Sequence, residues 1–409
     1  MIIYQHKRMN MQTITPIPSQ ATTFESQPLE STMEKLLELR ARKCDITIPV
    51  ADIEMVSTGD FIVTVKAPGQ EPYDLMLTPT DIAIKQISQK MGIPLPYWRR
   101  LLKDNLPLAA QNFNSWAAWE RNRATTEDKA RERSIFVRAY WDNDVHEGTG
   151  TMRAFLSDGY FSVDQYSLLI KALQVTAMMK EQRGLDIQVA ECSLTDEKFY
   201  VRFICPSIQR QSRELLENYR DPNGGEFGGV GQDYGIVTGY ILSNSEVGYG
   251  QLLVSPMCYI RACANNMIWR SAAFARRHLG SKMVKGLFSR ETEEKNLELI
   301  ESQISDSIKD FLSEETLGAM VKDLDEMGRR VLQHPSQVIT NLVEEIKLSE
   351  DEGKRVLEMF YRGGSTKNAF DVAQAMTASA KFYNSDRRTQ LEEKATEIMS
   401  FIDKIDRPA

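Results

Sequence analysis

The chain has 409 residues, enough for two or three domains, and its 42% hydrophobic and 26% charged residues are ordinary for a globular protein. Its five scattered cysteines and four separated histidines argue against a disulfide scaffold and against a zinc motif. The net charge is −7, but residues 291–409 carry 25 acids and 16 bases, a balance of −9 that leaves +2 for the first 290 residues.

Nothing in the sequence predicts membrane insertion or export. No run approaches the roughly 18 apolar residues of a membrane-spanning helix, and the N-terminus lacks an apolar segment of secretory type. We therefore expect a cytoplasmic protein that does not span a membrane. Residues 1–39 are predicted to form a disordered arm, because the first 32 are rich in Thr, Ser, Pro and Gln.

Strands and short helices are predicted after this arm. Apolar and polar side chains alternate over residues 45–65, which is typical of half-buried strands. A helix that begins near Thr78 is predicted to stop at Gly92, and a short second helix is predicted over 97–104. Residues 105–133 mix both signs of charge and are predicted to be a solvated helix or loop.

More strands follow along the chain. Residues 134–141 and 151–160 are predicted strands, and the capping box formed by Ser162 and Gln165 introduces an apolar helix. A β-hairpin, the glycine-rich loop NGGEFGGVG and two further strands precede residue 257. The prediction for residues 40–290 is an α+β domain with an antiparallel sheet and flanking helices. Residues 291–409 show helical periodicity throughout, with a second capping box formed by Ser349 and Glu352, and are predicted to be an all-α acidic domain.

The stretch between Glu246 and Glu291 contains no acid. Residues 257–279 are predicted to form one helix in which an apolar stripe faces the core and the opposite face is basic. Guanidinium groups suit phosphates, and an indole ring can stack on any base, so this face is a candidate surface for single-stranded nucleic acid. The candidate nucleic-acid-binding residues are Arg261, Asn265, Asn266, Trp269, Arg270, Arg276, Arg277, Lys282 and Lys285. The alternative is that the same face packs on the acidic helices that follow it.

Signals for catalysis are sparse. The glycine-rich loop is not followed by Gly-Lys-Ser/Thr or by a helix, so it matches neither a phosphate-binding loop nor a dinucleotide fingerprint. Asp158, Asp164 and Glu246 are the acids that a metal-dependent enzyme could use, but Asp is also common at turns and helix starts. We assign no catalytic residue, metal or cofactor.

Three ordered segments resemble a phage and plasmid family catalogued as domain of unknown function 932. They are LTPTDIAIKQISQKMGIPLPYWRRLL, RAFLSDGYFSVDQ and SNSEVGYGQLLVSPMCYIRACANNMIW. Asn266 departs from the family pattern, which has Gly there. The resemblance implies a protein of mobile elements and carries over no catalytic residue.

Together these observations predict a nucleic-acid-binding protein that acts without catalysis in recombination or replication, with single-stranded DNA as its partner and homo-oligomers as a further prediction. One alternative is an oligomeric or host-protein-interacting phage protein that does not bind nucleic acid. The other is the metal-dependent enzyme that uses the three acids named above.

Overall fold

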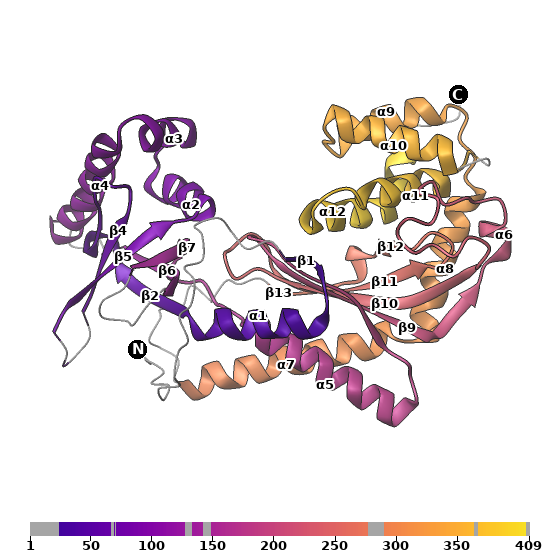
Figure 1. The fold of residues 1–409 in the computed structure, drawn as a ribbon, viewed down its shortest axis with the longest axis horizontal. Coiled ribbons are helices and arrows are strands. Elements are labelled where there is room, and N and C mark those ends of the chain that lie inside the picture. The colour runs from indigo at the N-terminus through magenta and orange to yellow at the C-terminus, as the bar shows by residue number, and fades with distance from the viewer. Residues whose placement is uncertain are drawn as a thin grey trace.

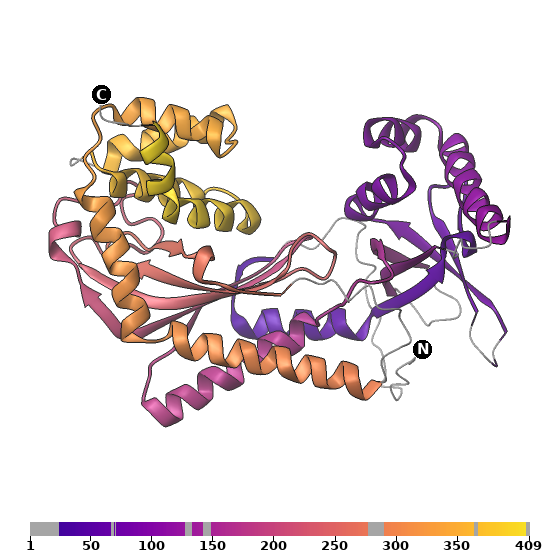
Figure 2. The same ribbon diagram turned by 180° about the vertical axis from the view of Figure 1, so that it is seen from behind.

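The computed structural model describes residues 24–66, 69, 71–126, 133–141, 149–276, 290–363 and 367–405. Thirteen strands in these ranges form two sheets, and helices pack around both, which confirms the α+β class. The smaller sheet and its helices lie at one end of the molecule (Figure 1), and the C-terminal helices lie at the other end, next to the larger sheet. The view from behind shows the same separation (Figure 2).

The larger sheet, sheet A, has the strand order β1-β8-β9-β10-β11-β12, and β13 also pairs with β11. All its pairings are antiparallel. Its strands are β1 (Phe24–Gln27), β8 (Gln188–Leu194), β9 (Phe199–Gln211), β10 (Gly235–Asn244), β11 (Leu252–Ile260), β12 (Asn265–Ile268) and β13 (Phe274–Arg276). The short helix α6 (Arg213–Leu216) follows β9.

Both faces of sheet A are covered. On one face lie α1 (Leu29–Ala41), α5 (Gln165–Arg183) and α7 (Arg290–Phe311), as Figure 1 shows. Two contacts fix this layer: Tyr240 Oη lies 3.2 Å from Thr176 Oγ1 of α5, and Thr238 Oγ1 donates to the backbone oxygen of Phe311 at 3.1 Å. On the opposite face, Tyr200 donates to Asp386 of helix α12 (Ser385–Thr396) at 2.7 Å.

The smaller sheet, sheet B, has the order β2-β6-β7-β5-β4-β3. Its strands are β2 (Lys43–Pro49), β3 (Ile53–Met55), β4 (Phe61–Val65), β5 (Tyr73–Pro79), β6 (Ser134–Trp141) and β7 (Thr149–Ser157), and a 3-10 turn η1 (Val50–Asp52) joins β2 to β3. Only the β5–β7 pairing is parallel among the pairings in the described part of this sheet.

Three helices accompany sheet B: α2 (Asp81–Met91), α3 (Leu95–Asp104) and α4 (Leu106–Thr126). Helix α2 ends at Gly92, as predicted, because glycine adopts the left-handed conformation there, with φ of 67°. Its N-cap is Thr80, whose hydroxyl oxygen accepts from the backbone of Ala83, so the start near Thr78 was placed two residues too early.

The C-terminal part is helical, as predicted, and contains α7, α12 and five more helices. These are α8 (Glu314–Arg329), α9 (Pro335–Glu345), α10 (Glu350–Gly363), α11 (Ala369–Ala380) and α13 (Ile398–Ile405). Two reciprocal hydrogen bonds join Ser349 and Glu352 at the start of α10, which is the expected capping box.

The hydrophobic core does not divide at residue 290. One cluster of buried residues joins α1, α5 and sheet A to the C-terminal helices, where every residue of α11 is buried. A second cluster belongs to sheet B with α2, α3 and α4. The secondary structure changes from mixed to helical at residue 290, whereas the boundary between the two large hydrophobic clusters lies between sheet B and the rest of the protein.

The predicted helix over 257–279 is wrong. Residues 257–276 contain the end of β11, a turn, β12, a short 3-10 turn (Arg270–Ala272) and β13. Ala264 has φ of 54° in the turn, which no right-handed helix accommodates. Eight of the nine residues of β11 are buried, so the strand lacks the polar alternation that reveals half-buried strands.

The predicted disordered arm is also too long. Residues 1–23 lie outside the described residues, but β1 and α1 occupy most of 24–39. Helix α1 buries Thr32, Leu36 and Leu39. The polar composition of the first 32 residues concealed this narrow stripe.

Candidate functional site

Three of the six predicted nucleic-acid-binding residues that the structure describes are buried inside the protein. Asn265 is fully buried and donates to the side-chain oxygen of Gln374 on α11 at 2.8 Å, and Asn266 is also buried. Trp269 is 7% exposed, and its indole N–H donates to Asp323 of α8 at 2.8 Å. The side chains of Asn265 and Trp269 therefore attach the edge of sheet A to the C-terminal helices.

The predicted arginines also have partners within the chain. Arg270 pairs with Glu393 of α12 at 2.8 Å, and Arg261 pairs with Asp233 at 2.9 Å. Arg276 donates to the side-chain oxygen of Asn296 on α7 at 3.2 Å. For Trp269 and Arg270, these contacts agree with packing on the acidic helices. Arg277, Lys282 and Lys285 lie outside the described residues.

A buried charge cluster forms where sheet B meets the connection between β10 and β11. Its members come from distant parts of the chain and are Lys43 of β2, Arg138 of β6, Arg153 of β7, Asp164 at the N-cap of α5, and Glu246. We call these five residues the Glu246 cluster.

Both carboxylate oxygens of Glu246 accept hydrogen bonds from neighbouring groups. Lys43 Nζ lies 2.5 Å from its Oε1 and 2.7 Å from Asp164 Oδ2. The backbone N–H of Gln165 donates to the same Oε1 at 3.0 Å, and the Arg153 guanidinium donates to Oε2 at 3.2 Å. Arg138 donates to the backbone oxygen of Glu246 at 2.6 Å.

Electrostatics keep this carboxylate ionised. Burial alone would raise the pKa of Glu246, but the charges of Lys43, Arg138 and Arg153 outweigh it and hold the pKa well below its usual range. The pKa of Asp164 is lowered in the same way, because Lys43 outweighs its burial. An ionised carboxylate whose two oxygens already accept strong hydrogen bonds is not available as a general acid or as a base.

The geometry does not favour the metal-dependent alternative. The ammonium group of Lys43 occupies the position between Asp164 and Glu246 that a bridging cation would need. Asp158 is exposed on the turn after β7. Across the described residues, no three His, Cys, Asp or Glu side chains are grouped to hold a metal ion.

Residues from all three resemblance segments meet at or beside the Glu246 cluster. Gln86 of α2 accepts from the backbone of Phe155 at 2.8 Å and donates to the backbone of Val247 at 2.6 Å. Tyr160 donates to the backbone oxygen of Ser245 at 2.7 Å. Sequence reasoning missed Lys43 and Arg138, because a single base in a strand carries no sign of a partner some 100 to 200 residues away.

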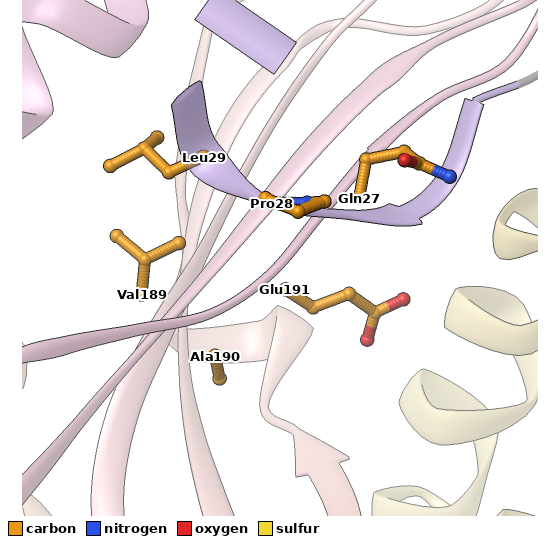
Figure 3. Close-up of a pocket in the computed structure, with 6 residues that line it drawn as sticks. All are labelled: Gln27, Pro28, Leu29, Val189, Ala190 and Glu191. Carbon is orange, nitrogen blue, oxygen red and sulfur yellow. The ribbon is translucent and has the colours of Figure 1, made fainter. Parts of the chain in front are cut away.

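A small pocket lies where β1 and the start of α1 pass over β8. Figure 3 shows Gln27, Pro28 and Leu29 on one side, and Val189, Ala190 and Glu191 on the other. Its volume is about 230 Å³, below the usual range for small-molecule sites. Glu191 is already engaged by Arg202 and Arg388, each at 2.9 Å, so the pocket has no uncompensated charge to bind a ligand.

An exposed aromatic pair lies on α4. Trp116 and Trp119 are 43% and 49% exposed, and their rings meet edge to face at 5.5 Å. The segment 105–133, predicted to be a solvated helix or loop, is helical over Leu106–Thr126, but its surface is not merely polar. The sequence signal was the spacing of the two tryptophans, three residues apart.

Comparison with family models, with curated proteins and with solved structures found no match. No helix within the described ranges is long and apolar enough to span a membrane. The resemblance to the phage and plasmid family therefore stays a prediction that rests on its three segments.

Proposed function

We propose that the protein binds nucleic acid, in particular single-stranded DNA, as a non-catalytic component of a mobile element. The observation that carries this proposal is the stretch from Arg276 to Arg290, which has five Lys or Arg residues and no acid in a chain of net charge −7. Arg276 donates to the neutral amide oxygen of Asn296 rather than to a carboxylate.

The proposed binding surface contains fewer residues than the surface inferred from the sequence. Trp269 and Arg270 are engaged by acids of α8 and α12, so they belong to the fold. The phosphate contacts are assigned instead to Arg276, Arg277, Lys282 and Lys285. Clustered cations attract a polyanion and release its counterions, so the binding should weaken steeply with salt.

The test is fluorescence anisotropy with a labelled single-stranded oligonucleotide at several salt concentrations. Replacing Arg277, Lys282 and Lys285 together by Glu should weaken binding strongly and flatten the logarithmic salt dependence by about two units. The matched control replaces Lys295, Lys322 and Lys354 by Glu. These three lysines are well exposed on the C-terminal helices, so the control makes the same change in net charge elsewhere.

Two outcomes would contradict the proposal. One is the absence of binding by the unaltered protein at micromolar concentration and low salt. The other is an equal loss of binding in the control, which would indicate an effect of net charge alone. If no binding is found, the alternative of an oligomeric or host-interacting protein predicts one of two results. Light scattering should show self-association, or the protein should capture a host protein.

A further inference from the structure

We infer that the outward face of α4 is a stacking platform for unpaired bases, formed by Trp116 and Trp119. This inference rests on the proposed function, because it names the part of the nucleic acid that the protein would recognise. It does not depend on the basic stretch from Arg276 to Arg290.

Helix α4 is anchored so that this face is held outward. Phe113 packs edge to face on Phe61 of β4 and Phe155 of β7, with ring centroids 5.0 and 6.5 Å apart. The side chain of Asn114 accepts from the backbone N–H of Met55 at 2.8 Å and donates to its backbone oxygen at 2.9 Å. These contacts fix the rotation of the helix, so little conformational freedom remains to be lost when a ligand binds.

The exposed tryptophans are exceptional within this chain. The other three tryptophans, Trp98, Trp141 and Trp269, are at most 8% exposed. A tryptophan that keeps nearly half its surface in water loses a large stabilising contribution from burial. Two of them on one face of a helix therefore indicate a surface that is covered in a complex.

The side chains around the two tryptophans favour an uncharged stacking partner. Among positions 107–122, the exposed residues are Pro107, Leu108, Gln111, Ser115, Trp116, Ala118, Trp119, Arg121 and Asn122, and none is acidic. Glu120, which is the one acid in the α4 sequence, is buried and pairs with Arg133 at 3.3 Å. Arg121 is engaged elsewhere, because its guanidinium donates to the backbone oxygen of Ala51 and lies 4.0 Å from the Asp52 carboxylate. Indole rings beside uncharged amides and a hydroxyl suit the face of a base, which stacks without needing a charge.

Stacking also distinguishes the form of the nucleic acid. The faces of bases are hidden inside a duplex, whereas in a single strand they are open to an aromatic ring. The platform should therefore bind unpaired bases with little sequence preference, and a duplex of the same length should not reach the two rings.

Tryptophan emission reports directly on this site, because Trp116 and Trp119 are the exposed pair. Titration with an oligothymidine should quench part of the emission, and the Trp116→Ala, Trp119→Ala double variant should lose that quenching. Anisotropy should show affinity reduced about tenfold for each tryptophan replaced by Ala, and less for replacement by Phe. Tyr361→Ala, which removes a 64% exposed aromatic ring on α10, is the matched control and should bind normally.

An oligomer of abasic residues adds an independent arm. It should bind the wild-type protein about as weakly as the double variant binds oligothymidine. If the wild-type protein binds oligothymidine in a salt-dependent manner but neither quenching nor affinity changes with the tryptophans, the platform is refuted and the proposed function stands. If the wild-type protein binds no oligonucleotide, both proposals fail. Loss of self-association in the double variant with unchanged DNA affinity would assign the face to protein contact and overturn the inference.

Discussion

The carboxylate of Glu246 is wholly buried, yet the surrounding protein favours its ionised form. Lys43 and Arg153 contact its two oxygens, and Arg138 binds its backbone while also forming two hydrogen bonds of 2.9 Å to Asp45. Each cation loses its hydration on burial, and these ion pairs and hydrogen bonds compensate for that loss. Removal of the central acid should therefore affect every neighbour at once.

We predict that Glu246→Gln lowers the free energy of unfolding by about 3–5 kcal/mol at pH 7. The variant removes the buried carboxylate charge that Lys43 and Arg153 contact directly, which is the costly way to break a buried ion pair. Urea denaturation measures the change. Glu226→Gln, at an exposed position of the glycine-rich loop, is the control and should stay within about 0.5 kcal/mol of the unaltered protein.

The pH dependence of this difference has a definite sign. The pKa of Glu246 in the folded protein lies below its ordinary value of 4.5, so its stabilising contribution is complete above that pH. It is lost as the pH falls through the folded-state pKa. The stability difference between the unaltered protein and Glu246→Gln should be constant above about pH 5 and should shrink below it. Equal stability of the two proteins at pH 7 would contradict the role of the cluster.

At the scale of elements, the segment 257–276 shows how fully buried strands can imitate the apolar periodicity of a helix. Ile260, Ala264 and Met267 fall on one plausible helical stripe, but the residues of β11 and β12 are buried from both sides in a sheet. Periodicity reports the environment of a segment, and a strand covered on both faces has no period of two. Only the turn at Ala264 distinguishes the two structures locally.

A single substitution can decide between these structures. Ala264→Gly should leave stability unchanged or raise it by up to about 1 kcal/mol, because glycine adopts φ of 54° without the steric cost that alanine carries. In a helix, the same change would lower stability by about 1 kcal/mol. The control is Ala118→Gly at an exposed position of α4, which should show that loss. Chemical denaturation of both variants provides the comparison.

Sequence analysis predicted well most elements whose signals are local, although the N-cap of α5 is Asp164 and not Ser162 of the predicted capping box. The left-handed cap at Gly92, the box formed by Ser349 and Glu352, and the series of C-terminal helices follow from neighbouring residues. The partners of Trp269 and Arg270 are acids of α8 and α12, which lie 54 and 123 residues further along the chain. No pattern near residue 270 contains that information, so the basic residues that support the fold could not be separated from those available to a ligand.

At the scale of the whole molecule, the described residues form two large cores, and the division between them differs from the change in composition at residue 290. Sheet A shares one cluster of buried residues with α1, α5 and the C-terminal helices, whereas sheet B has its own. Cooperative unfolding follows shared burial rather than element type. The acidic helices should therefore unfold together with sheet A and not as a separate unit.

Hydrogen exchange can test this division with two matched core variants. Phe370 of α11 is 1% exposed and packs edge to face on Tyr219, and Phe113 of α4 is fully buried against sheet B. Each Phe→Ala change should cost about 3–5 kcal/mol. We expect Phe370→Ala to reduce the protection of β10 in sheet A together with the C-terminal helices, and to leave β4 in sheet B nearly unaffected. Phe113→Ala should have the opposite pattern. If Phe370→Ala exposed only the helices and left β10 protected, residue 290 would mark an energetic boundary, and the C-terminal helices would be an independent domain placed against sheet A.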